Sequence, residues 1–455
     1  MNKETEKENK ILTGVIWKQL LIFFFPILIG TFFQQMYNTV DAVVVGRFAG
    51  KEALSSVGGS AGQLINLVVG FFTGLTAGGT VLISQYYGAK QKLRLDDALH
   101  TAYAFSIVGG ILLGILGVAV ASPVLRLMNT PEELMGQSSL YMRVYFAGLV
   151  FVFVYNMGAS VLRAIGDSRR PLYYLIVCSI VNIVLDILLV MVIPLGVLGA
   201  AIATLISQAV SAVLVTLALM RRTPGLKLRL KDIRFCPGVL KNILQIGLPT
   251  GIQSSMYSLS NMIVQSSLNL LGVDTMAAWT AFGKIDSLFW MINGSFGIAA
   301  TTFVGQNFGA GKYSRVKKGT RVCLGMALGT AVAISAALIA AGKYLFMLFV
   351  GEPQVVEIGL RMMRVISPTY ALFVFIEIFS GSLRAQGHTL VTTLISLVGI
   401  CLYRAVWVTW IVPGGTLEQV ISCYPISWFT CATIVSVYYF YKQRKIIQEV
   451  YSRPV

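Results

Sequence analysis

Long apolar runs separated by short polar segments make up most of this 455-residue chain. A run of about 20 mostly apolar residues is long enough to cross a lipid bilayer as an α-helix. The pattern therefore predicts an all-α integral membrane protein with twelve transmembrane helices. These helices are expected to begin near Trp17, Leu54, Thr101, Ser138, Pro171, Leu198, Lys241, Met276, Val322, Gly359, Val391 and Glu418.

The composition agrees with a membrane protein and excludes most soluble classes. Hydrophobic residues make up 56% of the chain and charged residues 12%, whereas soluble domains average about 45–50% and 25%. The net charge of +17 is not gathered on one surface, because the Lys and Arg lie in short segments between apolar runs. We therefore expect no nucleic-acid partner. The six cysteines include no CxxC pair and are expected to pack as small hydrophobic residues.

The distribution of Lys and Arg predicts the orientation in the membrane. If the N-terminus is cytoplasmic, most of the 36 Lys and Arg fall in cytoplasmic segments and few fall outside. Cytoplasmic loops of membrane proteins carry an excess of these residues. Both termini are therefore predicted to be cytoplasmic, as an even number of helices requires.

The sequence contains an internal repeat. A shift of 221 residues places residues 78–91 on 299–312, and 160–167 on 381–388, with several identities in each pair. Each half contains six predicted helices, so the halves share one orientation and form a parallel repeat. Two similar lobes with a site between them are what alternating access by rocking requires, which predicts a transporter.

The repeat also predicts the domain boundaries. A cytoplasmic tail covers residues 1–15, a first lobe of six helices 16–222, a cytoplasmic linker 223–240, a second lobe of six helices 241–442, and a cytoplasmic tail 443–455.

Acidic side chains at membrane depth are rare and therefore functional candidates. Asp41 lies in the first predicted helix and Asp186 in the fifth, at similar depth to Asn182 and Thr204. Asn182 and Asp186 are four residues apart and lie on one helix face. Oxygen ligands of this kind suit Na⁺, while two neighbouring carboxylates repel each other and also suit a shared proton. Residue types alone leave both ions open, as well as a structural role in bridging helices.

Other polar residues in apolar runs are candidates for an ion or substrate cavity. They are Asn156, Glu377, Gln265, Tyr37 and Asp286. Instead of lining a cavity, Glu377 could form an ion pair with Arg404, Lys284 or Arg364. Aromatic side chains suit flat cationic ligands through stacking and cation–π contact, and Tyr257, Phe282, Phe289 and Trp290 are examples.

Pro26 and Gly30 are expected to bend the first helix and to act as a hinge. Our hypothesis is that ion binding at Asp41 changes this bend. The chain has no P-loop, no nucleophile elbow and no His/Cys/Asp cluster with metal-ligand spacing. We therefore expect neither an enzyme nor a cofactor, apart from Na⁺ or H⁺ as coupling ion.

Several motifs resemble the multidrug and toxic compound extrusion (MATE) family, and the DinF-like branch more than the NorM-like branch. They are DAVVVGRFAGKEALSSVG (41–58), SQYYGAK with its repeat GQNFGAG, LRAIGDSRRP (162–171) with its repeat LRAQGH, and the Asn182/Asp186 pair. The resemblance implies a V-shaped pair of six-helix bundles. It also implies ion coupling at Asp41, Asn182, Asp186 and Thr204, with Na⁺ as the metal that these residues would bind.

Together, these features predict a secondary antiporter of the bacterial cytoplasmic (inner) membrane that contributes to antibiotic resistance. It would export amphipathic organic cations as a monomer surrounded by lipid, in exchange for Na⁺ or H⁺. A flippase for lipid-linked oligosaccharides or another amphipathic lipid precursor is the alternative. Anionic diphosphate head groups would require several bases in the cavity, and only Lys284 and Arg404 qualify.

Overall fold

The computed structural model describes residues 9–221 and 226–451, and every regular element in these ranges is a helix. Residues 1–8 and 452–455 of the predicted tails, residue 222 of the first lobe and residues 223–225 of the linker lie outside the described part.

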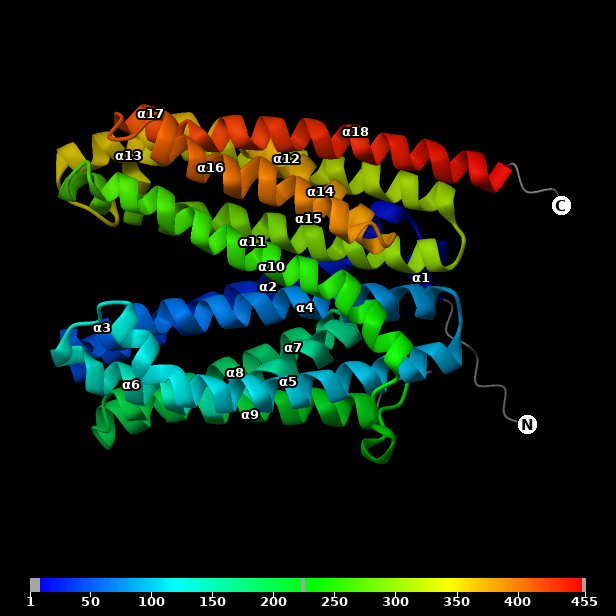
Figure 1. Ribbon diagram of the computed structural model, residues 1–455, viewed down its shortest axis with the longest axis horizontal. Helices are drawn as coiled ribbons and strands as arrows, with labels where there is room; N and C mark the ends of the chain where they lie inside the picture. The colour runs from blue at the N-terminus through cyan, green and yellow to red at the C-terminus, as the bar shows by residue number, and fades with distance from the viewer. Residues whose placement is uncertain (1–8, 222–225, 452–455) are drawn as a thin grey trace. The chain divides into compact units, whose positions relative to one another are not determined.

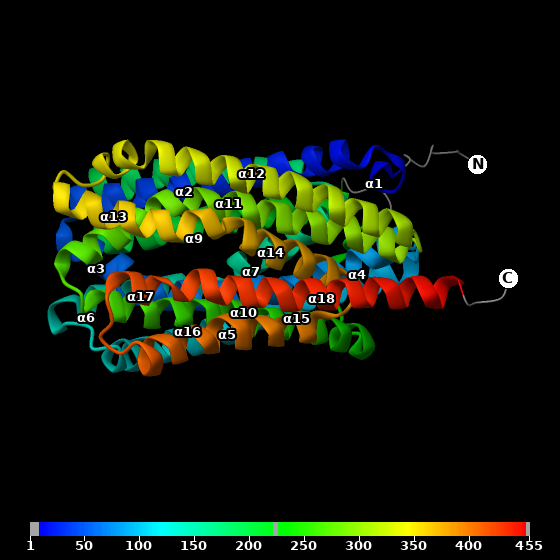
Figure 2. The ribbon, with the colours of Figure 1, turned by 90° about the horizontal axis from the view of Figure 1, so that it is seen from above.

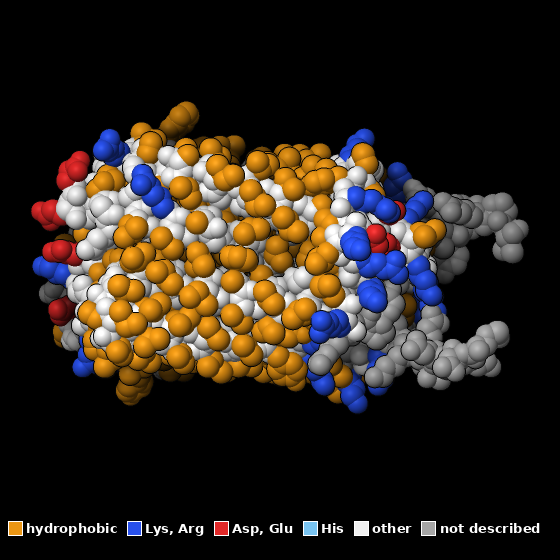
Figure 3. Space-filling view, turned by 90° about the horizontal axis from the view of Figure 1, so that it is seen from below, with side chains coloured by type: hydrophobic (Ala, Val, Ile, Leu, Met, Phe, Trp, Pro, Cys, Tyr) orange, Lys and Arg blue, Asp and Glu red, His pale blue; other side chains and the backbone are white. Residues whose placement is uncertain are grey.

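Helices occupy all twelve predicted positions in the described ranges. Ten helical segments are long and apolar enough to cross a membrane. Two further helices, α6 (Glu132–Ala147) and α7 (Leu149–Ala164), meet at a bend of 48° and together qualify as an eleventh span. The remaining position is taken by α10 (Pro237–Asn269), whose second half is rich in Ser, Asn and Gln. Hydrophobic side chains cover most of the face shown in Figure 3, with Lys and Arg gathered toward one end. The predicted all-helical, multi-pass fold is confirmed.

The chain forms two compact units. One consists of Phe25–Gly251, and the other of Met1–Phe24 and Ile252–Val455, as far as these ranges are described. The divisions fall inside two helices, α2 (Ile16–Val44) and α10, within two residues of Pro26 and Pro249. The start of each of these helices therefore belongs to a different unit from its end.

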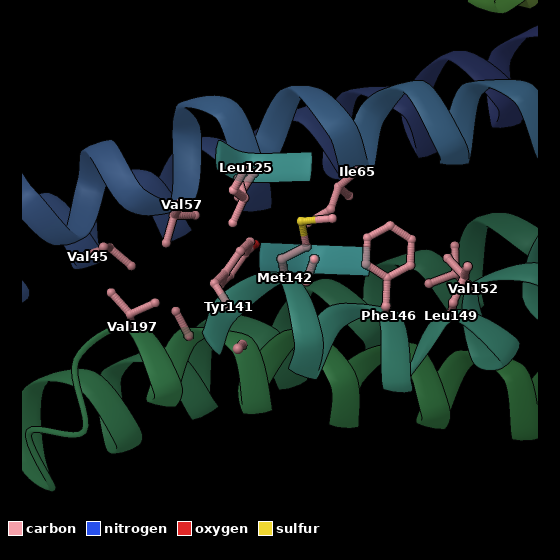
Figure 4. Close-up of a cluster of buried hydrophobic side chains, with 14 of the residues drawn as sticks. Val45, Val57, Ile65, Leu125, Tyr141, Met142, Phe146, Leu149, Val152 and Val197 are labelled. Atoms are coloured by element: carbon pink, nitrogen blue, oxygen red, sulfur yellow. The ribbon is translucent and has the colours of Figure 1, made fainter. Parts of the chain in front are cut away.

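The unit formed by Phe25–Gly251, which we call the first unit, has a hydrophobic core between α4, α5, α6 and α9. Figure 4 shows part of this core, including Tyr141, Met142 and Phe146 of α6. Besides α6, α7 and parts of α2 and α10, the helices of this unit are η1 (Val45–Ala49), α3 (Lys51–Gly58), α4 (Ser60–Gly88), α5 (Lys92–Leu127), α8 (Arg169–Asp186), η2 (Ile187–Val192), α9 (Val197–Arg221) and η3 (Leu230–Asp232).

Small residues explain why the start of α10 packs in the first unit. Gly74 and Gly78 of α4 lie against the backbone of α10, where Gly247 and Gly251 occur at the same four-residue spacing. A Cβ atom on Gly78 would collide with the backbone of Ile243. Close backbone approach through small residues is a common mode of helix association in membranes.

The second unit begins with α1 (Lys10–Thr13) and the start of α2. Ring stacking joins Phe24 to Phe296 at 4.1 Å, and Arg315 donates to the carbonyl oxygen of Ile11 at 3.1 Å. The other helices are the rest of α10, α11 (Val273–Gly309), α12 (Tyr313–Met347), α13 (Pro353–Ile366), η4 (Ser367–Thr369), α14 (Tyr370–Ala385), α15 (Thr389–Ser396), η5 (Leu397–Leu402), α16 (Tyr403–Val406), η6 (Trp407–Ile411), α17 (Leu417–Ile421) and α18 (Cys423–Tyr451). The longest helices of this unit are visible in Figure 1, and α18 packs along α14 (Figure 2).

Candidate functional site

Asp41 and Asp186 come together in the first unit, and we call them the acid pair. Their carboxyl groups lie within hydrogen-bonding reach of each other. Asp41 lies one turn before the end of α2, and Asp186 is the last residue of α8. Both helices then continue as π-helical segments, η1 and η2. Such segments are rare and often mark functional sites.

The polar atoms at the acid pair lack protein partners. Asn182 and Asp186 are fully buried. Both oxygens of Asp186, both amide atoms of Asn182 and Oδ1 of Asp41 have no hydrogen-bond partner among the described residues. Two ionised carboxylates only accept, so their contact becomes a hydrogen bond only when one carries a proton. An unpaired buried polar group costs about 1–3 kcal/mol, and a charged one more. The arrangement is therefore suited to a bound proton or a small cation.

The other candidates in the first unit surround this position less closely. Tyr37 is buried, and Tyr141 of α6 is near enough to Tyr37 and to both acids for electrostatic interaction. Thr204 is half-buried on α9, which packs against α8. Asn156 of α7 donates from Nδ2 to a backbone carbonyl one turn earlier at 2.8 Å. The structure thus brings Asp41 and Asp186 within reach of each other, with Tyr141 near both acids and near Tyr37.

The second unit contains a cavity of about 400 Å³, and half of its lining residues are aromatic. It includes Gln265 and Asp286 among the predicted residues. The lining residues are Tyr257, Asn261, Gln265, Trp279, Phe282, Gly283, Asp286, Trp290, Ile366, Phe373, Ile400, Arg404, Tyr424 and Trp428.

The cavity has one acid and one base among its lining residues. Asp286 accepts hydrogen bonds from the Tyr370 hydroxyl and from the Trp290 indole N–H. Arg404 donates from Nη1 to Oδ1 of Asn261 and from Nε to the hydroxyl of Ser427, both at 3.2 Å. All four of these partners are neutral, so both charges remain uncompensated by them.

Glu377 is not among the lining residues of the cavity. It lies against Gly297 of α11, where a Cβ atom would collide with the Glu377 carboxylate. Within the described ranges, none of the three bases considered as its partners forms an ion pair with it. At the predicted hinge, α2 continues as a helix through Pro26 and Gly30.

A family model described as MatE matches residues 26–188 and 249–409, which include most of the first unit and much of the second. The chain belongs to the MatE family. The two matched segments begin at Pro26 and Pro249, in agreement with the internal repeat. The prediction of family membership is confirmed, whereas the branch within the MatE family stays a prediction.

Similar proteins cover nearly the whole chain. "Probable multidrug resistance protein YoeA" of Bacillus subtilis is 30% identical over 403 residues, covering 87% of this chain and 86% of YoeA. "Probable multidrug resistance protein YpnP" of the same organism is 27% identical, covering 86% and 87%. A crystal structure of a MATE protein in the bent conformation has a TM-score of 0.91 at 22% identity, covering 98% of this chain and 99% of that one.

These findings establish a MatE-family membrane transporter, and the prediction that the chain is not an enzyme is confirmed by its family. Sequence reasoning missed two features of the second unit. Tyr370 was not predicted beside Asp286, because the two residues lie far apart in the chain. Arg404 was considered as an ion-pair partner and as a base of the cavity but not as a functional candidate itself, although a charged residue in an apolar run is a functional signal.

Proposed function

We propose that the chain is a secondary antiporter that exports amphipathic organic cations in exchange for Na⁺ or H⁺. The acid pair carries this proposal, because its buried oxygens have no protein donors in the described residues. The names of the similar proteins YoeA and YpnP support multidrug compounds as the substrate class.

Ion coupling is assigned to Asp41 and Asp186, with Asn182 and Thr204 as neighbouring oxygen ligands. Repulsion between the two carboxylates falls when a proton or Na⁺ binds between them. The amide oxygen of Asn182 is buried and unpaired in the described structure, so it is available to a cation. Thr204 lies on α9, which packs against α8, and supplies a hydroxyl oxygen.

We assign the bending that alternating access requires to the two places where a helix passes from one unit into the other. Pro26 and Pro249 lie within two residues of these points, so a bend in either helix changes how its two parts are joined. Gly30 lies against α8, and a Cβ atom added there would be 3.3 Å from Leu175. Because α8 ends at Asp186, ion binding is mechanically connected to the proposed hinge at Pro26 and Gly30.

The proposed location is the bacterial cytoplasmic membrane, with both termini in the cytoplasm. The Lys and Arg gathered at one end of the apolar surface support this orientation (Figure 3). The proposed state is a monomer in lipid without a nucleic-acid partner. Arg404 is the one base among the described lining residues of the cavity. A single base favours organic cations as substrates over the lipids with diphosphate head groups that a flippase would carry.

Efflux of ethidium from proteoliposomes tests the proposed function. The purified chain is reconstituted, and efflux is measured under a Na⁺ gradient alone and under a pH gradient alone. We expect efflux under at least one gradient, and loss of that efflux in Asp41→Asn. Folded protein that moves no ethidium under either gradient would contradict the antiporter proposal and favour the flippase.

A further inference from the structure

Arg404 is a buried base that has no role in the ion coupling proposed at the acid pair. It is 4% exposed, and it lies on α16 between two π-helical segments, η5 and η6. No ion pair in the described part of the chain includes Arg404. Removing a guanidinium from water is unfavourable unless an anion or a full set of acceptors replaces the water. Asn261 and Ser427 are neutral acceptors, so the charge of Arg404 has no counter-ion there.

Arg404 lines the cavity, and its contacts there leave part of the guanidinium available to a ligand. The guanidinium carbon lies 4.0 Å from the ring centre of Tyr424 and 5.7 Å from that of Trp428. Aromatic rings contact the faces of such a cation, whereas its N–H donors lie in its plane. Nη2 donates no hydrogen bond to a described residue, because the hydrogen bonds of this side chain within the described ranges come from Nε and Nη1. A carboxylate is the group whose geometry matches these donors.

Trp428 provides a second unpaired donor at the same place. Its side chain is 1% exposed, and its indole N–H has no hydrogen-bond partner among the described residues. An unpaired donor in a low-dielectric interior is unfavourable, and an acceptor beside it removes that cost. Arg404 and Trp428 together therefore favour an anionic group in this part of the cavity.

Asp286 supplies the opposite charge in the same cavity. Its two oxygens accept from neutral donors, and Asp286 forms no ion pair in the described ranges. Tyr424 is near enough to interact electrostatically with both Arg404 and Asp286. The cavity thus holds a positive and a negative group that do not pair with each other, with aromatic side chains around them.

We propose that this cavity binds amphipathic aromatic zwitterions, with the ligand carboxylate at Arg404 and the ligand ammonium group at Asp286. Its volume of about 400 Å³ lies in the usual range for drug-sized ligands. The inference extends the substrate class of the export proposed above from organic cations to compounds that also carry a carboxylate, and it therefore rests on that function.

Three dansyl compounds with similar chains test the inference. Nε-dansyl-lysine carries both charges, dansylcadaverine lacks the carboxylate, and dansyl-6-aminohexanoate lacks the ammonium group. Binding to the full chain in lipid nanodiscs is measured by dansyl fluorescence. We expect dansyl-lysine to bind about ten- to a hundredfold more tightly than dansylcadaverine, as for hydrogen bonds between charged groups. We expect dansyl-lysine to bind more tightly than dansyl-6-aminohexanoate by a similar factor.

Variants assign each preference to its residue. Arg404→Gln should make dansyl-lysine and dansylcadaverine bind equally, and Asp286→Asn should do the same for dansyl-lysine and dansyl-6-aminohexanoate. Lys284→Gln is the matched control, because Lys284 is an exposed base of α11 outside the lining and its loss should change neither preference. Asn261→Ala, which removes only one acceptor of Arg404, should reduce the preference for the carboxylate severalfold without removing the base.

Equal binding of dansyl-lysine and dansylcadaverine to the wild type would overturn the inference. So would a carboxylate preference that survives Arg404→Gln in folded protein. Ion-driven efflux of dansylcadaverine is measured on the same preparation to keep the two proposals separate. Efflux without the carboxylate preference would reject the zwitterion site alone, and the preference without efflux would reject the antiporter alone.

Discussion

Asp186→Asn should stabilise the ion-free protein, which is unusual for a substitution at a fully buried residue. The side chain keeps its shape but loses one of two facing charges, and its amide can donate to Asp41. Two unit charges about 4 Å apart interact by about 4 kcal/mol at an effective dielectric constant of about 20. Relief of this repulsion therefore adds at most about 4 kcal/mol to the free energy of unfolding when both carboxylates would otherwise be ionised.

The same substitution should remove the response of the protein to its coupling ion. A cation between the carboxylates is attracted by both, so loss of one charge takes away about 4 kcal/mol of attraction. This loss corresponds to an affinity decrease of about a thousandfold. Ligand at a hundred times its dissociation constant stabilises the native state by about 2.7 kcal/mol, which the variant should no longer gain.

Thermal unfolding of the purified chain measures both effects. Na⁺ is titrated against choline at constant ionic strength, and pH is then varied without Na⁺. Asp274→Asn is the matched control, because Asp274 is an exposed carboxylate at the start of α11. The reasoning is refuted if Asp186→Asn is less stable than the wild type without Na⁺ at alkaline pH and responds to Na⁺ and protons as the wild type does.

Three further substitutions, one of them with a control variant, test interactions elsewhere in the two units. Gly78→Val places a side chain against the backbone of α10 and should lower stability by about 1–3 kcal/mol in thermal unfolding, whereas Gly136→Ala, with open space around it, should not. Arg315→Ala removes hydrogen bonds to the backbone of the N-terminal segment, so amide exchange at Lys10–Thr13 should become faster. Burial lowers the pKa of His388 below its usual 6.5, so its contribution to stability is complete above pH 6.5 and declines as the pH falls below it. His388→Gln should flatten this part of the pH profile of unfolding.

The fold was largely predictable from the sequence because membrane helices leave a strong local signal. Runs of about 20 apolar residues located the helices, and the match of 160–167 with 381–388 located the repeat. The division into units was not predictable in this way. It depends on contacts such as Gly78 with Ile243, which are distant in sequence and leave no periodic pattern.

The candidate sites were predictable in their residues but not in their contacts. Depth and spacing singled out Asp41, Asn182 and Asp186, yet only the structure shows that the two acids face each other. Asp286 and Trp290 are four residues apart and so share a helix face, which was a usable signal. The environment of Arg404 depends on partners in α10 and α18, and no local pattern connects them.

Counterflow of ion and substrate tests the central claim most directly. Proteoliposomes without any ion gradient are given an outward gradient of ethidium, and movement of Na⁺ and of protons is followed at the same time. The account predicts that ethidium leaving the vesicles drives one of these ions inward in a fixed ratio, and that Asp41→Asn and Asp186→Asn abolish this ion movement. Ethidium flux through the folded protein without any coupled ion movement, or ion movement that persists in both variants, would contradict it.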